Sequence, residues 1–407
     1  MELIAQLTGV IKHYDWGGYS FIPGLLNVPN EKKIPFAEYW LGVHPLAECE
    51  LVMSDGSVRL LKDYFSTSSP TAMGAYVSRR FGTMPYLLKA LDVREMLSIQ
   101  VHPSKTDVAK DFAEETEQGV PIDSPRRNYK DDNHKPELMV AMGDFWLLHG
   151  FKPEDELRKT LQQIPELNFL LQVFNQSGYK GLYKTIMEMP QEKVNASLQP
   201  LSKRIILLFQ EGKLDQAQAH YWAAKAVLRF SDAGTFDRGI FSIYLFNLLK
   251  LQKGEAVFQD SGVPHAYLEG QNVEIMASSD NVLRGGLTNK PVNVPELLKH
   301  VLCEATHPEI LRGKNNGNEL VYETPAPDFE LSSFKLNKGA REKITTTTAE
   351  VFLLVEGEIN IADKSNSIIL KKGCPSALAL AGNELQVTAI ESAWFFKASV
   401  PNHKAGK

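Results

Sequence analysis

Four side chains that could hold one metal ion lie in separate segments of this sequence, so the fold must bring those segments together. Gln100 and His102 stand two residues apart, Glu137 follows later in the chain, and His265 comes much later. Residues two apart on a strand point to the same face, so Gln100 and His102 would project together from an extended segment. Two imidazole nitrogens and two side-chain oxygens suit a divalent metal. The set therefore predicts one metal site built from distant segments.

The ligand types indicate what such a metal would do. Gln is an uncommon ligand, and a neutral oxygen beside a single carboxylate leaves the bound metal with net positive charge. Such a metal suits Lewis-acid chemistry on a substrate oxygen. Taken singly, each residue has a plainer interpretation: His102 precedes Pro103 and would fit a turn, and Glu137 would fit a solvated surface. The segments read together favour the metal site.

The residues before His265 indicate the kind of fold. Gly254 and Gly262 flank an apolar segment at positions typical of turns. Glycine allows positive φ at tight corners, and the histidine follows where the next strand would begin. This resembles the second motif of the cupin superfamily, in which a strand, a glycine turn and a metal-ligating His line a small jelly-roll barrel. Such a resemblance implies a fold and a metal but no particular reaction.

A wider set of motifs is more specific. Five blocks occur in order along the chain: YDWGG at 14–18, AEYWLGVHP at 37–45, LSIQVHP at 97–103, NYKDDNHKPE at 128–137 and SDNVLRGGLT at 279–288. This order resembles that of the type I phosphomannose isomerases, also called mannose-6-phosphate isomerases, and the resemblance thins out after the last block. It implies an isomerase with one Zn²⁺ per chain that interconverts mannose 6-phosphate and fructose 6-phosphate through an enediol, supplying mannose metabolism and GDP-mannose synthesis.

Hydrophobic periodicity changes twice along the chain. Short apolar runs separated by turn residues predict antiparallel strands up to residue 152. In 153–235 apolar residues recur every three or four positions, which predicts helices; in one of them, at 214–230, Ala217, Tyr221, Ala224 and Leu228 form the apolar stripe. An apolar run at 241–249 then predicts a return to β-strand.

These changes predict a mainly β fold with an α insertion, consisting of two cupin-like jelly-roll β barrels and a helical domain. The catalytic cupin domain is discontinuous and comprises 1–152 and 236–320. The helical insertion domain is 153–235. The C-terminal domain, 321–407, is a degenerate cupin-like β domain, because no histidine follows Gly373 before His403 to serve as a ligand.

Composition narrows the choice of partners and compartment. A net charge of −5 with interspersed acids and bases provides no broad basic field for nucleic acid or membrane, so the phosphate of a phosphosugar substrate must be bound locally. Cys49, Cys303 and Cys374 are far apart and odd in number, which is typical of free thiols in a reducing compartment. Without a long apolar segment, a cytoplasmic enzyme is expected. The sequence leaves the oligomeric state open, and a monomer is compatible with it.

The candidates for catalysis lie in or near the matched blocks. Arg284 is the natural second source of positive charge for a developing oxyanion, and the resemblance implies an active-site role for it. Glu274 and Lys135 are equal candidates for the proton-transfer group, with His134 behind them. Support of the metal and its ligands is the alternative role for all three.

Phosphate recognition needs hydrogen-bond donors at one end of the pocket. Lys89, Ser98 and Lys290 have the right chemistry, although each would also fit an ordinary surface or turn position. Lys290 follows Asn289 and precedes Pro291, whereas many relatives have the lysine after a proline. Trp16 is a candidate for the pocket wall, with a core contact as the alternative.

Two rival functions compete with the isomerase. A metal-cupin oxygenase would need iron and a ligand set richer in histidine, and Gln100 argues against it. A non-catalytic phosphosugar-binding cupin module would need the barrel but not the whole set of Arg284, Lys135 and Glu274, whose presence beside four intact ligands argues against that role.

Overall fold

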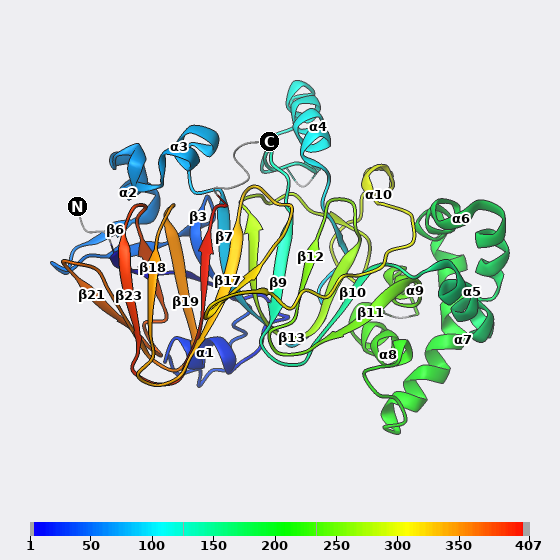
Figure 1. The fold of residues 1–407 in the computed structure, drawn as a ribbon. Coiled ribbons are helices and arrows are strands. Elements are labelled where there is room, and N and C mark those ends of the chain that lie inside the picture. Colours follow the sequence, from blue (N-terminus) through cyan, green and yellow to red (C-terminus); the bar gives the residue numbers. More distant parts are fainter. Residues whose placement is uncertain (1–3, 125, 233, 402–407) are drawn as a thin grey trace.

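The computed structural model describes residues 4–124, 126–232 and 234–401 of this chain. It is a mixed fold with more strand than helix, built from antiparallel sheets and a helical segment, as the sequence predicts. Figure 1 shows the strands of the C-terminal part at one end of the molecule, a second group of strands in the middle, and helices α5 to α8 at the other end.

The middle group of strands forms one sheet, here called the site sheet because it carries the predicted metal ligands. Its main path runs β11-β10-β13-β7-β3-β2, and further strands pair alongside. The strands on the path are β11 (Phe246–Leu251), β10 (Phe145–Phe151), β13 (His265–Ala277), β7 (Tyr86–Val93), β3 (Glu38–His44) and β2 (Val10–Lys12). The strands alongside are β4 (Ala47–Glu48), β8 (Gln100–Val101), β9 (Glu137–Ala141), β12 (Ala256–Gln259) and β14 (Leu283–Arg284).

Strand β13 joins two halves of the site sheet. Its first residues pair with β10 and β8, and its residues from Gly270 onward pair with β7 and β9. Gly270 has φ of +132°, and a Cβ there would lie 2.7 Å from the carbonyl oxygen of Asp144. Because only glycine fits this conformation and this space, the strand can change partners at its midpoint. The result places His265 and Glu274 on one continuous strand.

Helices fill the predicted insertion: α5 (Glu154–Gln163), α6 (Phe169–Glu188), α7 (Gln191–Gln210) and α8 (Ala219–Phe230). No helix in the described ranges has the length and apolar character needed to cross a membrane. The remaining helices are short or lie elsewhere: α1 (Phe21–Leu25), α2 (Leu61–Thr67), α3 (Ala75–Phe81), α4 (Lys105–Glu117), α9 (Gly239–Leu245) and α10 (Val294–His300).

Two details of the predicted secondary structure are wrong. Helix α8 begins only at Ala219, and Leu228 is 56% exposed, because the large Trp222 side chain turns a different face of the helix toward Trp146. The predicted strand at 241–249 is helix α9 up to Leu245 and becomes strand only from Phe246. Every residue of α9 is buried, so its apolar run has no exposed face to reveal a helical period.

The C-terminal strands form a second sheet that N-terminal strands extend, here called the terminal sheet. Ile4 pairs with Ala379, and a further strand pair follows on its outer side. The predicted three-domain division stays a prediction. The first sixty residues contribute strands both to the site sheet and to the terminal sheet. In spatial order the strands are β15 (Lys314–Asn316), β16 (Glu319–Tyr322), β17 (Glu330–Leu336), β24 (Ala393–Ser399), β19 (Glu350–Glu356), β22 (Ser376–Ala379), β1 (Ile4–Thr8), β5 (Glu50–Val52) and β6 (Val58–Leu60).

A four-stranded sheet packs against the terminal sheet through a shared hydrophobic core. Its strands are, in spatial order, β18 (Arg341–Thr345), β23 (Glu384–Ala389), β20 (Ile359–Ala362) and β21 (Ser367–Leu370). The site sheet and the terminal sheet share one hydrophobic core, in which Leu41 and Leu88 pack with Phe329 and Leu353. The Tyr86 hydroxyl also donates to the carbonyl oxygens of Ala349 and Ala398. The two strand regions are therefore fastened to each other.

Glu350 in β19 is a buried carboxyl whose protonation should control stability. Burial raises its pKa to about 7, an effect that Lys397 only partly opposes. The folded state thus holds this proton more tightly than the unfolded state, and the resulting stability is lost as pH rises from the unfolded pKa through about 7. We expect the free energy of unfolding of Glu350→Gln, relative to that of wild type, to be about 2–3 kcal/mol more favourable at pH 8 than at pH 5. Denaturant unfolding of both proteins at the two pH values measures this. The same difference between variant and wild type at both pH values would contradict it.

Candidate metal centre and active site

Three of the predicted ligands meet in the interior of the site sheet. The Nε2 atom of His102 lies 3.4 Å from one carboxylate oxygen of Glu137, and the Nε2 atom of His265 lies 3.3 Å from the other. All three side chains are buried, and their ligand atoms lie close enough together to share one ion. The structure therefore brings together residues that the sequence separates widely.

The backbone fixes how the two imidazoles face. The Nδ1 atom of His102 is 2.9 Å from the carbonyl oxygen of Asn281, and the Nδ1 atom of His265 is 3.0 Å from that of Val263. A ring that donates from Nδ1 presents a lone pair at Nε2. Within the described residues, both Nε2 atoms are buried without a hydrogen-bond partner. Such orphaned nitrogens around a carboxylate fit a bound metal ion.

A glycine turn links the segments that carry the two histidines. Gly262 has φ of +78° and its amide donates to the carbonyl oxygen of His102 at 2.8 Å. The positive φ is the conformation that the sequence pattern before His265 predicts for this corner. The turn thereby holds the start of β13 next to the end of β8.

Strand register accounts for a row of functional candidates across the site sheet. His265 pairs with Gln100, and Gln100 pairs with Arg284 on the next strand. On its other side His265 pairs with His149. Directly opposed residues on neighbouring strands project to the same face. Gln100 and Arg284 therefore lie on the face of the sheet that carries His265.

His149 is a buried residue that sequence reasoning missed. Burial lowers its pKa to about 4, and the nearby His265 adds to this shift. Its Nε2 atom is 3.3 Å from the carbonyl oxygen of Phe258. No motif surrounds it in the sequence, so only the strand register with His265 could have revealed its place beside the metal cluster.

Charge around the cluster favours a bound cation. Burial raises the pKa of Glu137, but Lys135 and His102 outweigh burial, and the net effect is a pKa well below the ordinary value. The ammonium of Lys135 is 2.8 Å from Glu137. Burial also lowers the pKa of His102 to about 4, so this imidazole is neutral near pH 7. Neutral imidazoles and an ionised carboxylate are the protonation states that metal ligation needs.

A second group of charges lies next to the first. The ammonium of Lys89 is 3.1 Å from Glu274 and 3.7 Å from Glu38, and all three side chains are buried. Burial lowers the pKa of Lys89, but the charges of Glu274 and Glu38 outweigh burial and raise it above its ordinary value. The Tyr267 hydroxyl donates to the second Glu274 oxygen at 2.7 Å. Burial, followed by the charge of Glu137, raises the pKa of Glu274.

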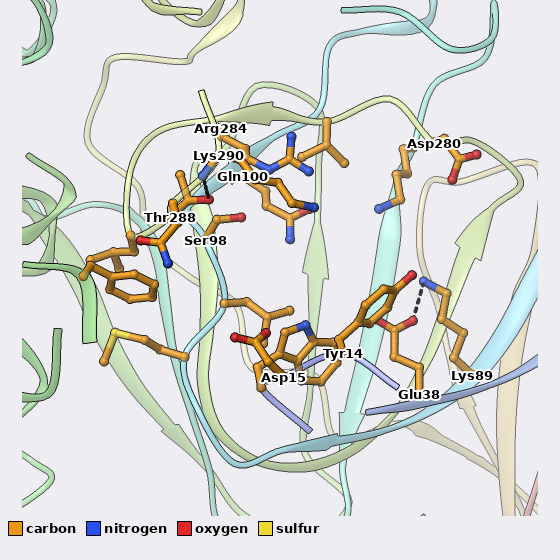
Figure 2. Close-up of a pocket in the computed structure, with 18 of the residues that line it drawn as sticks. Tyr14, Asp15, Glu38, Lys89, Ser98, Gln100, Asp280, Arg284, Thr288 and Lys290 are labelled. Atoms are coloured by element: carbon orange, nitrogen blue, oxygen red, sulfur yellow. Dashed lines mark hydrogen bonds and ion pairs between the residues drawn. The ribbon is translucent and has the colours of Figure 1, made fainter. Parts of the chain in front are cut away.

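A cavity of about 730 Å³ opens onto this region (Figure 2). A smaller inner cavity of about 50 Å³ continues from it toward Glu137, His265 and Glu274. Gln100, Lys89 and Lys135 line both. The other predicted site residues that line the larger cavity are Trp16, Ser98, Arg284 and Lys290.

Figure 2 shows Arg284, Gln100, Ser98 and Lys290 grouped on one wall of the larger cavity, away from the Glu38 and Lys89 pair. Burial lowers the pKa of the Arg284 guanidinium from its ordinary value. Burial and then the charge of Arg284 lower the pKa of Lys290. Across the described ranges, no carboxylate forms an ion pair with either of them, and only the charge of Asp15 partly opposes the lowering of the Lys290 pKa. This wall therefore presents positive charge that is available to an anionic ligand.

His134 lies apart from the cavities. Its Nε2 atom is 2.8 Å from a carboxylate oxygen of Asp328. Among the described residues that line the two cavities, His134 is absent. Its catalytic role stays a prediction. Sequence reasoning missed Glu38 and Tyr14, although both stand in matched blocks, because their proximity to Lys89 arises only from tertiary packing.

Comparisons with known proteins agree over nearly the whole chain. A family model described as the catalytic domain of type I phosphomannose isomerase matches residues 4–154. The mannose-6-phosphate isomerase of Escherichia coli (strain K12) is 33% identical over 389 residues, which cover 94% of this chain and 96% of that protein. A crystal structure of a phosphomannose isomerase variant from Salmonella typhimurium has a TM-score of 0.88 at 29% identity. A zinc-bound crystal structure of mannose 6-phosphate isomerase has a TM-score of 0.85, covering 98% of this chain and 100% of that chain.

Proposed function

Because this chain belongs to the type I phosphomannose isomerase family, we propose that it is a zinc-dependent enzyme that interconverts mannose 6-phosphate and fructose 6-phosphate. The observation that carries this proposal is the buried cluster of His102, Glu137 and His265 at the base of a cationic cavity, whose two Nε2 atoms have no hydrogen-bond partner among the residues that the structure describes. A phosphosugar is the corresponding substrate. The three cysteines are free thiols, which supports the cytoplasm as the proposed compartment.

The zinc site that we propose consists of His102, Glu137 and His265, with Gln100 as the fourth ligand. Gln100 lines the inner cavity together with Glu137 and His265, and it pairs with His265 in the sheet. When bound, zinc would polarise sugar oxygens and offset negative charge that develops on them. Three buried carboxyl groups, those of Glu38, Glu137 and Glu274, face only two ammonium groups, those of Lys89 and Lys135, and a bound cation would offset the excess negative charge.

Arg284 is the side chain that we propose for stabilising the enediol. In the isomerisation a proton leaves C2 of the aldose and a proton is returned to C1, while the O2 hydroxyl loses a proton and O1 gains one. Negative charge therefore develops on these two neighbouring oxygens of the enediol. The guanidinium lies on the cavity wall, on the strand next to Gln100, and its two-pronged donor geometry matches a pair of adjacent oxygens. It remains protonated at all working pH values, so its charge is constant during turnover.

The cavity geometry favours Lys135 for the proton transfer. Lys135 lines both cavities, whereas Glu274 lines only the inner one and has Lys89 and Tyr267 within 3.1 Å of its oxygens. A group that moves a proton must reach the substrate carbon, and geometry takes precedence over pKa in choosing it. We therefore propose Lys135 for this step, with Glu274 balancing buried charge and serving as the alternative.

Phosphate binding is best supported at Lys290 and Ser98. Both line the larger cavity on the wall that carries Arg284, and Lys290 is exposed at the cavity surface (Figure 2). The ammonium of Lys89 is already paired with Glu274 and Glu38, so a phosphate would have to compete with two buried carboxylates for it. Trp16 lines the same cavity and stacks with Tyr14, consistent with a place in the pocket wall.

Chelation should abolish turnover reversibly. We expect purified protein to convert mannose 6-phosphate to fructose 6-phosphate in a coupled assay, to lose this activity after treatment with a strong chelator, and to regain it when stoichiometric zinc is restored. Protein treated with zinc-saturated chelator is the matched control, because it meets the same molecule without losing metal. Circular dichroism before and after treatment would confirm that the fold persists.

The same assay separates the isomerase from a phosphosugar-binding module. A module would hold zinc and bind mannose 6-phosphate in calorimetry without forming fructose 6-phosphate. Absence of turnover in fully zinc-loaded protein would therefore overturn the proposed enzyme and favour the module.

A further inference from the structure

A carboxylate from the C-terminal part contacts the segment that carries the candidate catalytic lysine. Asp328 lies in the connection between β16 and β17, and its Oδ2 atom is 2.8 Å from Nε2 of His134. Asp328 is 1% exposed, and its second oxygen is buried without a hydrogen-bond partner among the described residues. A buried carboxylate is costly unless it is paired, so the contact with His134 is its main compensation.

The segment that His134 belongs to is held at its two ends. At one end, the carbonyl oxygen of Asn133 accepts hydrogen bonds from Asn281 at 2.9 Å and from Ser279 at 3.1 Å. At the other end, the Pro136 carbonyl oxygen accepts from the amide of Ala277 at 3.2 Å, just before β9 begins. Between these two backbone hydrogen-bonded positions, the side chain of His134 contacts Asp328.

Lys135 directly follows His134, and its ammonium is 2.8 Å from Glu137. A rotation of the backbone at His134 would move the Lys135 side chain relative to the zinc site. Glu137 itself is held by strand pairing with Gln259 on β12 and with Met276 on β13. Loss of the contact at Asp328 would therefore disturb Lys135 more than it disturbs Glu137.

We infer that Asp328 is a positioning residue for the isomerase: it holds His134, and through His134 it sets the place of Lys135 beside the zinc site. This inference rests on the proposed function. It assigns the C-terminal part of the chain a role in catalysis, although the four zinc ligands proposed above lie outside that part. A buried carboxylate that orients an imidazole is a well-attested way of fixing groups around a metal centre.

Kinetics should separate this role from general stability. We expect Asp328→Ala to lower kcat about tenfold, with KM changed by less than about threefold and zinc still stoichiometric. Asp328→Asn keeps an acceptor oxygen for His134 and should recover part of kcat. Glu350→Gln is the matched control, because it alters a second buried carboxyl, one that accepts from the amide of Thr347 rather than from His134, and its kcat should equal that of wild type.

A double-mutant cycle tests whether the two residues act as a unit. We expect His134→Ala to lower kcat about as much as Asp328→Ala, and the double variant to lose no more than either single one. Multiplying losses in the double variant would overturn the inference, as would normal kcat in Asp328→Ala or a change confined to KM. If wild-type protein loaded with zinc has no turnover, the proposed function fails first, and the inference fails with it.

The contact itself can be measured without turnover. Nitrogen NMR of protein labelled at histidine reports which ring nitrogen carries the proton. We expect the His134 signal in wild type to be that of a ring protonated at Nε2, and to change in Asp328→Ala but not in Glu350→Gln. An unchanged signal in Asp328→Ala would show that the carboxylate does not orient the ring, whatever the activity of the enzyme.

Discussion

His265→Ala is expected to give a folded protein that has lost both stoichiometric zinc and isomerase turnover. The substitution removes one of the two buried Nε2 atoms that face Glu137, so the metal would keep too few strong ligands. Loss of a residue that merely supports a ligand costs about 10- to 100-fold, and loss of a ligand itself should exceed that range. His265 is the first residue of β13, and the remaining pairs of this strand are untouched, so the sheet should persist.

Zinc content of the purified variant, measured by metal analysis alongside kcat, checks this prediction. His220→Ala is a suitable control, since His220 lies in the helical segment and contacts Tyr244 rather than the metal cluster. The control should keep its zinc. Stoichiometric zinc in His265→Ala would contradict the assignment of this residue as a ligand.

The metal cluster was predictable because its signals are local. Gln100 and His102 stand two apart in an extended segment, and Gly262 precedes His265 in a turn that needs positive φ. Each of these features can be read from neighbouring residues without knowledge of the tertiary structure. Local sequence patterns do not show how close the distant segments lie in the folded chain. Only the family resemblance indicated that they meet at one metal site.

Features that depend on strand register could not be predicted. His149 becomes a neighbour of the cluster only because β10 pairs with the start of β13, and Ile4 joins the terminal sheet only through Ala379. The apolar run of helix α9 predicts a strand, because burial on all sides removes the periodicity that distinguishes a helix from a strand. Pairing partners of this kind are set by long-range packing rather than by local pattern.

Buried charge shows the same limit at the site. Lys89 is a reasonable phosphate ligand by residue type, and its role as a substrate contact stays a prediction. In the structure its ammonium lies between Glu38 and Glu274, and their charges hold its pKa above the ordinary value. Residue type alone cannot distinguish a lysine that is available to bind a substrate anion from one that is already ion-paired with two carboxylates.

Arg284 is the opposite case, and Arg284→Ala should remove catalysis while sparing the metal. Its guanidinium faces the cavity without a carboxylate partner within the part of the chain that the structure describes. Its charge is therefore available to the oxygens of the enediol. Removing one preorganised donor to a developing oxyanion lowers kcat about 10²- to 10³-fold, and we expect a loss in that range. Zinc should remain stoichiometric, because the His102, Glu137 and His265 side chains are unchanged.

Two further variants make the test specific to Arg284. Arg284→Lys keeps the positive charge but loses the fixed fork of donors, so its kcat should lie between those of wild type and Arg284→Ala. Arg312→Ala removes an exposed arginine that pairs with Glu255, and it should leave kcat unchanged. Steady-state kcat and KM for mannose 6-phosphate, with zinc content measured on the same samples, give the comparison. A normal kcat in Arg284→Ala would remove this residue from the mechanism, whereas a loss of zinc would mean that its place beside Gln100 on the sheet supports the metal ligands instead.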